Sequence, residues 1–120
     1  SFFDRVEIQK HKLIKFLEDA KKAGKEVYGL GASTKGNVLL QYYGINEDLL
    51  PAIGHVNEDK FGKFTPGSLI PIISEADVLK RKPDYLVVLP WHFKDFFLSN
   101  PKMKGLSLVF PLPELTIIEL

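Results

Sequence analysis

The chain alternates between segments whose apolar residues recur at helical spacing and short segments that are apolar throughout. Between residues 4 and 23 the apolar side chains fall on one stripe, lysines and glutamates occupy much of the remaining surface, and Gly24 follows. This pattern is typical of an amphipathic helix that ends at a glycine cap. We therefore expect a leading helix within residues 1–24.

Beyond Gly24, short apolar runs bounded by turn residues predict strands, and longer mixed segments predict helices. The expected strands are 25–30, 52–56, 69–73 (interrupted by Pro71), 84–89, 106–110 and 115–119. The expected helices are 33–43, 74–80 with Ser74 as its N-cap, and one or two turns within 92–98. Alternating strands and helices with short links predict an α/β fold, a doubly wound and mostly parallel sheet with Rossmann-like topology, preceded by the amphipathic helix.

Composition narrows the possible functions. The 120 residues are 45% hydrophobic and 26% charged, as expected of one globular domain. Sixteen basic and 15 acidic residues leave a formal charge of +1, so we expect neither nucleic acid nor a membrane as a partner. Cysteine is absent and the three histidines are scattered, so we expect no metal site. No apolar run approaches the roughly 20 residues that cross a bilayer, and we expect a cytoplasmic protein.

The segment between the first predicted strand and the next helix is rich in glycine. Residues 31–36 read Gly-Ala-Ser-Thr-Lys-Gly. Glycines permit a tight turn and the close approach of a ligand, and the amides at the start of a helix favour an anion. Thr34 stands where the dinucleotide fingerprint has its third glycine, and Asn37 stands where a P-loop has its lysine. We therefore expect no nucleoside triphosphatase, and close packing of strand on helix is an equally open reading.

Two further loops belong with this segment, because ligands of such sheets bind beyond the carboxyl ends of the strands. The loop after 52–56 carries Asn57, Lys60 and Lys63, and the loop after 84–89 carries Trp91 and His92. An indole can stack on a base or sugar, and an imidazole can donate to a phosphate. For the loop after 52–56 the alternative is an ordinary solvated turn, and for Trp91 it is closure of the core.

The residues alone indicate a binding module. No acid–base pair and no nucleophile with an orienting base emerges, so the catalytic residues stay unknown. Tyr42 and Tyr43 are expected to pack their helix rather than to take part in chemistry.

Three long stretches together resemble a known family: GASTKGNVLLQYYGI at 31–45, NEDKFGKFTPGSLIPI at 57–72 and KPDYLVVLPWHFK at 82–94. They are similar to the C-terminal domain of S-adenosylmethionine-dependent sugar C-methyltransferases, which act on nucleotide-linked deoxy-keto sugars. The resemblance implies a cysteine-rich zinc segment and a central donor-binding domain elsewhere in such enzymes. It implies that residues 1–120 are a single Rossmann-like domain and a C-terminal fragment of a longer methyltransferase.

The same resemblance implies partners and roles. The full enzyme would use S-adenosylmethionine, bound by a domain outside this chain, and this domain would bind no cofactor itself. Its partners would be a nucleotide sugar resembling a thymidine diphosphate sugar and the N-terminal and central methyltransferase domains. The expected substrate-binding residues are Gly31, Ala32, Ser33, Thr34, Lys35, Gly36, Asn57, Lys60, Lys63, Trp91 and His92. The alternatives are a stand-alone Rossmann-type nucleotide-binding module and a domain that only packs on a partner.

Overall fold

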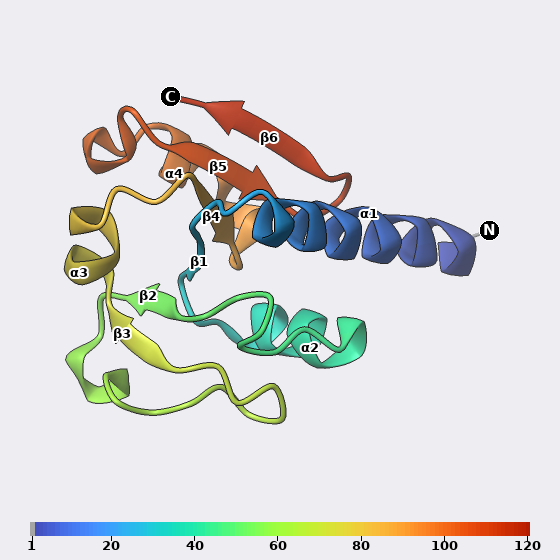
Figure 1. The fold of residues 1–120 in the computed structure, drawn as a ribbon, viewed down its shortest axis with the longest axis horizontal. Helices are drawn as coiled ribbons and strands as arrows, with labels where there is room; N and C mark the ends of the chain where they lie inside the picture. Colours follow the sequence, from blue (N-terminus) through green and yellow to red (C-terminus); the bar gives the residue numbers. More distant parts are fainter. Residues whose placement is uncertain (1) are drawn as a thin grey trace.

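A six-stranded sheet forms the centre of the computed structural model, which describes residues 2–120 (Figure 1). Its strands are β1 (Val27–Leu30), β2 (Ile53–His55), β3 (Ile72–Ser74), β4 (Tyr85–Val88), β5 (Ser107–Phe110) and β6 (Thr116–Glu119). Their spatial order is β3-β2-β1-β4-β5-β6, and every pairing is parallel except that of β5 with β6. An order of 3-2-1-4-5 is that of the Rossmann fold. The predicted mostly parallel, Rossmann-like sheet is therefore confirmed.

Helices cover both faces of this sheet, as a doubly wound fold requires. The helices are α1 (Phe2–Lys22), α2 (Thr34–Tyr43), α3 (Glu75–Lys80) and α4 (Lys94–Leu98), with 3₁₀ turns η1 (Glu58–Lys60), η2 (Trp91–Phe93) and η3 (Pro101–Met103). In β4, Val87 joins a buried cluster with residues of α1 and α2, whereas Leu86 and Val88 join a second cluster with residues of α3 and α4. This alternation explains why the strand is apolar on both faces.

The helix ends follow the expected local chemistry. The Ser74 side chain caps α3 by accepting a hydrogen bond from the Asp77 amide at 3.0 Å, as predicted. After α1, Gly24 has φ of 72°, and the amide of Lys25 donates to the Ala20 carbonyl at 2.9 Å. The predicted glycine stop of the leading helix is therefore present, although Ser1 of the predicted range 1–24 lies outside the described residues.

The third strand lies later in the chain than predicted. We expected residues 69–73, but β3 begins at Ile72. The preceding residues form a turn in which the Ile70 amide donates to Thr65 Oγ1 at 2.9 Å and the Leu69 amide donates to the Thr65 carbonyl at 2.9 Å. Leu69 itself has φ of 55°, which a strand does not accommodate.

Residues 2–120 contain neither a candidate membrane-spanning helix nor a cluster of metal-binding side chains. None of the helices within 2–120 is long and apolar enough to cross a membrane. In the same range, no three acidic or histidine side chains group in a way that would hold a metal ion.

Candidate functional site

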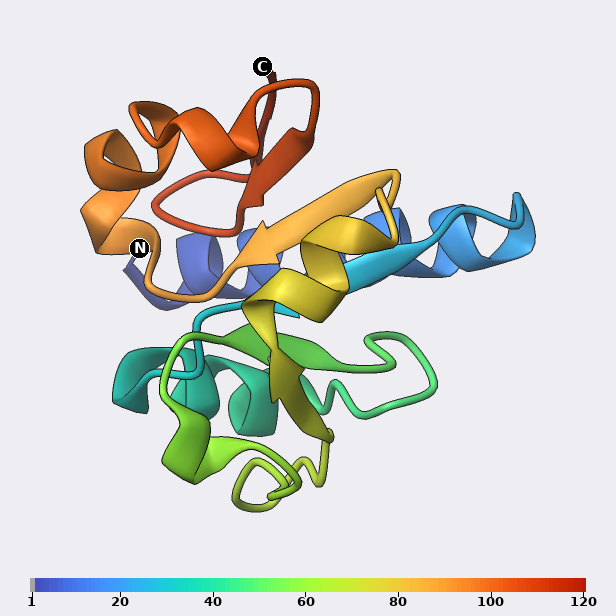
Figure 2. The same cartoon turned by 90° about the vertical axis from the view of Figure 1, so that its left-hand side faces the viewer.

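The carboxyl ends of β1, β2 and β4 meet at one edge of the sheet, because these neighbouring strands are parallel. Figure 2 shows the loops that follow them on its left-hand side, near the beginning of α1. This is the edge at which the fold rule places a ligand.

The first and third of these loops are in direct contact. A Cβ atom added to Gly31 would lie 2.9 Å from Cγ and Cδ of Pro90. One added to Gly36 would lie 2.6 Å from Cβ of Leu89 and 2.9 Å from Oγ of Ser33. Real Cβ atoms do not approach other atoms this closely, so packing disfavours a larger residue at both positions, and Gly31 also has φ of 81°. Strand-to-helix packing, the open alternative of the sequence analysis, is thus present here.

The exposed part of this glycine turn is the first turn of α2. Ala32 and Gly36 are buried, whereas Thr34 and Lys35 are exposed. Ser33 is the N-cap, and its Oγ accepts a hydrogen bond from the Gly36 amide at 3.1 Å. The amides of Thr34 and Lys35 have no intrahelical acceptor, because an α-helix leaves its first amides unpaired. They sit at the positive end of the helix, where Lys35 adds an exposed basic side chain, and these features suit an anion.

The second loop reaches the C-terminal part of α2, where the side-chain amide of Gln41 donates to the Pro66 carbonyl at 2.6 Å, but its predicted site residues lie toward β3. Asn57 caps η1, and its Oδ1 accepts from the Asp59 amide at 3.0 Å. The half-buried Lys60 and the exposed Lys63 belong to a segment that folds back along β3, where the Ile72 amide donates to the Lys63 carbonyl at 2.8 Å. Both lysines therefore lie beside β3, with β2 between them and β1.

The third loop brings the two predicted ring residues together. Trp91 is half-buried and packs against both core clusters, so closure of the core is one of its roles. Its ring centroid lies 5.9 Å from that of His92, edge to face. The ring centroids of the exposed His92 and of Phe93 are 4.3 Å apart. The structure thus places Trp91 and His92 immediately after Pro90, next to the glycine turn.

Residues that the sequence analysis missed surround Trp91. A hollow of about 740 Å³ lies between α1 and the segment before β6, and Arg5, Gln9 and Lys12 line it together with Trp91. Their spacing of four and three residues puts the α1 side chains on one helical face. That periodicity was the only signal in the sequence, because nothing local shows which part of the chain faces the helix.

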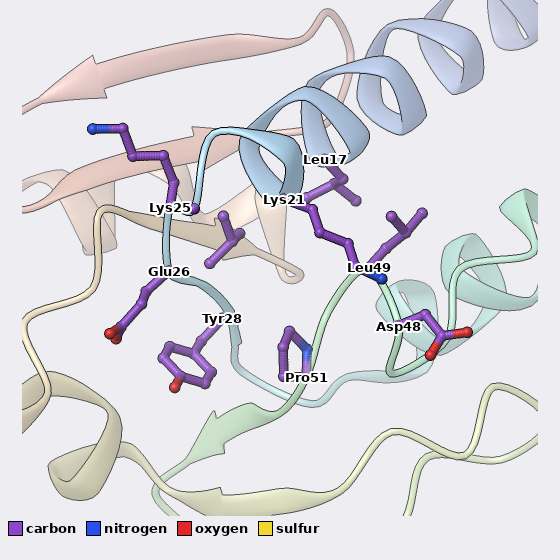
Figure 3. A pocket seen from close by; sticks show the side chains of 10 residues that line it. Leu17, Lys21, Lys25, Glu26, Tyr28, Asp48, Leu49 and Pro51 are labelled. Carbon is purple, nitrogen blue, oxygen red and sulfur yellow. The ribbon is translucent and has the colours of Figure 1, made fainter.

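A smaller hollow of about 270 Å³ lies at the opposite edge, where β1 begins (Figure 3). Figure 3 shows Lys21 extending from α1 toward Leu49, while the side chains of Lys25 and Glu26 point away. Tyr28 also lines this hollow, and its hydroxyl accepts a hydrogen bond from Arg81 at 3.1 Å. This edge holds the amino ends of the parallel strands, so the fold rule does not favour it as the binding site.

Sequence comparison groups the chain with known proteins. The profile of the family described as C-methyltransferase C-terminal domain matches residues 1–113. The chain is also 35% identical over 98 residues to the C-methyltransferase NovU of Streptomyces niveus, a match that covers 79% of this chain and 23% of the relative. The chain therefore spans about a quarter of the length of this curated relative.

Proposed function

The chain belongs to the C-methyltransferase C-terminal domain family, and from that premise we propose that it holds a nucleotide-linked sugar for methylation by a longer enzyme. In this proposal the chain is the C-terminal domain of that enzyme, in the cytoplasm. The size of the relative supports it, because 79% of this chain matches only 23% of a C-methyltransferase.

The observation that carries the proposal is the position of the first turn of α2. Thr34 and Lys35 are exposed there, at the edge where Pro90 of the third loop packs against Gly31. Two free amides, a helix dipole and an ammonium group together favour a pyrophosphate. The exposed His92 in the adjoining loop offers a further donor.

The methyl donor is assigned to another part of the enzyme. The chain matches only 23% of a C-methyltransferase, and we propose that S-adenosylmethionine and the catalytic base belong to the remainder. The residues of this chain then bind and orient. Holding the diphosphate away from the reacting carbon lowers the barrier by fixing that carbon against the methyl donor.

A second candidate function is a domain that only packs on its neighbour. Two observations favour it: the glycines are explained by packing, and Phe93 and Phe96 are 59% and 66% exposed near the same edge. An exposed aromatic pair is often covered by a protein partner. Ligand binding by the isolated chain separates the two candidates.

The deciding experiment is a titration followed by amide chemical shifts. A thymidine diphosphate sugar is expected to move the signals of residues 31–36, whereas S-adenosylmethionine, which has no phosphate group, is expected to leave them in place. If neither compound moves these signals, the packing function is favoured over sugar-nucleotide binding.

Lys35→Ala provides the matching prediction. We expect affinity for the thymidine diphosphate sugar to fall about two- to fivefold by calorimetry, because an exposed ion pair contributes at most about 1 kcal/mol. Lys104→Ala is the control, since this exposed lysine precedes β5 at the opposite edge of the sheet. Equal affinities of the two variants would contradict an anion at the start of α2.

A further inference from the structure

The hollow at the amino ends of the strands has a largely apolar lining (Figure 3). Leu17, Val27, Leu49 and Pro51 line it together with Tyr28. Its volume of about 270 Å³ lies just below the range that is usual for small-molecule sites, roughly 300–1,000 Å³. The hollow therefore suits a ligand with the size of a single ring rather than a nucleotide.

One ammonium group stands beside this apolar lining. Figure 3 shows the side chain of Lys21 extending from the end of α1 toward Leu49. The side chains of Lys25, Glu26 and Asp48, which also line the hollow, point away from its centre in the same view. Within residues 2–120, the Lys21 ammonium group forms neither an ion pair nor a hydrogen bond. A cation among apolar side chains favours a ligand that joins a negative charge to an apolar body.

Backbone hydrogen bonds hold the wall of the hollow that follows α1. Gly24 has φ of 72°, and its amide donates to the Lys21 carbonyl at 3.1 Å. The Glu26 amide donates to Asp84 Oδ2 at 2.8 Å, and the Asp84 amide donates to the Glu26 carbonyl at 2.9 Å. This double contact fixes the chain between α1 and β1.

The facing wall is fixed as well. The amides of Leu49 and Leu50 donate to the Asn46 carbonyl at 3.2 and 3.0 Å, in a turn before β2. The Tyr28 hydroxyl accepts a hydrogen bond from Arg81 at 3.1 Å, and the guanidinium carbon lies 5.4 Å from the centroid of the Tyr28 ring. The hollow is therefore formed before a ligand binds, which limits the entropy lost on binding.

We propose that this hollow binds a small carboxylate with an aromatic or aliphatic body, whose negative charge pairs with the Lys21 ammonium group. The apolar body lies against Leu49 and Pro51, beside Tyr28. The inference goes beyond the function proposed above, which concerns residues 31–36 at the other end of β1. Because β1 separates the two places, both ligands can be bound at once.

Three related compounds test the two parts of this ligand. Phenylacetate carries a ring and a negative charge, phenylacetamide carries the same ring without the charge, and acetate carries the charge alone. In titrations of the unaltered chain, we expect phenylacetate to shift the amide signals of Gly24, Val27 and Leu49. For so small a ligand the dissociation constant should be on the order of 1 mM. The shifts caused by phenylacetamide and by acetate at the same concentration should be severalfold smaller.

The result does not depend on the proposed nucleotide-sugar site. If phenylacetate leaves Gly24, Val27 and Leu49 unchanged, or if phenylacetamide shifts them equally, the inference is wrong, whatever a thymidine diphosphate sugar does at residues 31–36. Failure of the sugar to bind there would contradict only the proposed function.

A pair of variants tests the role of the charge. Lys21→Gln keeps a long side chain without the charge, and we expect it to weaken phenylacetate binding about two- to fivefold, as expected for an exposed ion pair. Lys22→Gln is the matched control, because this neighbouring lysine is not among the residues that line the hollow. Both lysines are exposed at the end of α1, so neither substitution alters the core. Equal affinities of the two variants for phenylacetate would overturn the proposal.

Discussion

At the scale of single residues, two adjacent tyrosines at the end of α2 have opposite surroundings. Tyr42 is exposed, and its hydroxyl donates to Glu7 Oε1 of α1 at 2.9 Å. This hydrogen bond is the main cause that raises the pKa of Tyr42, since only the protonated hydroxyl can donate. Tyr43 is 5% exposed, and burial raises its pKa. Its hydroxyl has no hydrogen-bond partner among residues 2–120.

These surroundings predict different effects of the same substitution. Tyr43→Phe removes a buried hydroxyl that lacks a partner, so we expect the free energy of unfolding to stay constant or to rise by up to about 1 kcal/mol. Tyr42→Phe removes the hydrogen bond to Glu7 and is expected to lower the free energy of unfolding. Urea denaturation at pH 7 measures both. A larger loss for Tyr43→Phe than for Tyr42→Phe would show that the buried hydroxyl is paired in solution.

At the scale of the element, α2 depends on Ser33 for its N-terminal cap, and the same residue stands at the proposed phosphate site. The side chain accepts from the Gly36 amide, which leaves the amides of Thr34 and Lys35 for a ligand. A single substitution at Ser33 can therefore change helix stability, anion binding or both. The chemistry of the replacement decides which.

Two substitutions at Ser33 separate these effects. Ser33→Ala is expected to lower the free energy of unfolding by about 1 kcal/mol, because the cap is lost. Ser33→Asp keeps a capping oxygen, so stability should change little, but its charge should weaken pyrophosphate binding severalfold. Ser74→Ala, at the cap of α3, is the control for cap loss without an effect on binding. Tight pyrophosphate binding by Ser33→Asp would place the anion elsewhere.

The elements that the sequence predicted correctly are those whose signals are local. The glycine stop after α1, the Ser74 cap and the apolar run of β4 each depend on a few neighbouring residues. The start of β3 was wrong by three positions, because a turn around Thr65 takes residues up to Ile70 out of the strand. Side-chain-to-backbone hydrogen bonds of this kind leave little trace in a pattern of apolar residues.

At the scale of the whole molecule, one hydrogen bond joins the first helix to the segment before the last strand. Gln9 and Leu115 are 106 positions apart in the chain. Long-range contacts of this kind explain which parts of the candidate site were missed. That residues 31–36 lie near Trp91 could be predicted, because both follow neighbouring parallel strands. The positions of α1 beside Trp91 and of Lys63 beside β3 could not, because they depend on how distant segments fold back. The role of residues 31–36, Trp91 and Lys63 in binding stays a prediction.

Gln9→Leu tests this connection. The substitution leaves the Leu115 amide without its acceptor, so we expect the free energy of unfolding to fall by about 1–3 kcal/mol. Hydrogen exchange at Leu115 should also become faster. Gln41→Leu is the matched control, because the amide of Gln41 donates to the Pro66 carbonyl in an exposed position, where water can replace the bond. A loss no larger than that of the control would indicate that the Gln9 contact adds little.

The tight fit of Gly31 against Pro90 and of Gly36 against Leu89 also bears on the kinetics of recognition. A segment packed this tightly loses little conformational entropy when a ligand binds. We therefore expect the association rate to be set by diffusional encounter, without a slow conformational change of the protein. The dissociation rate should then be set by the strength of the contacts in the complex.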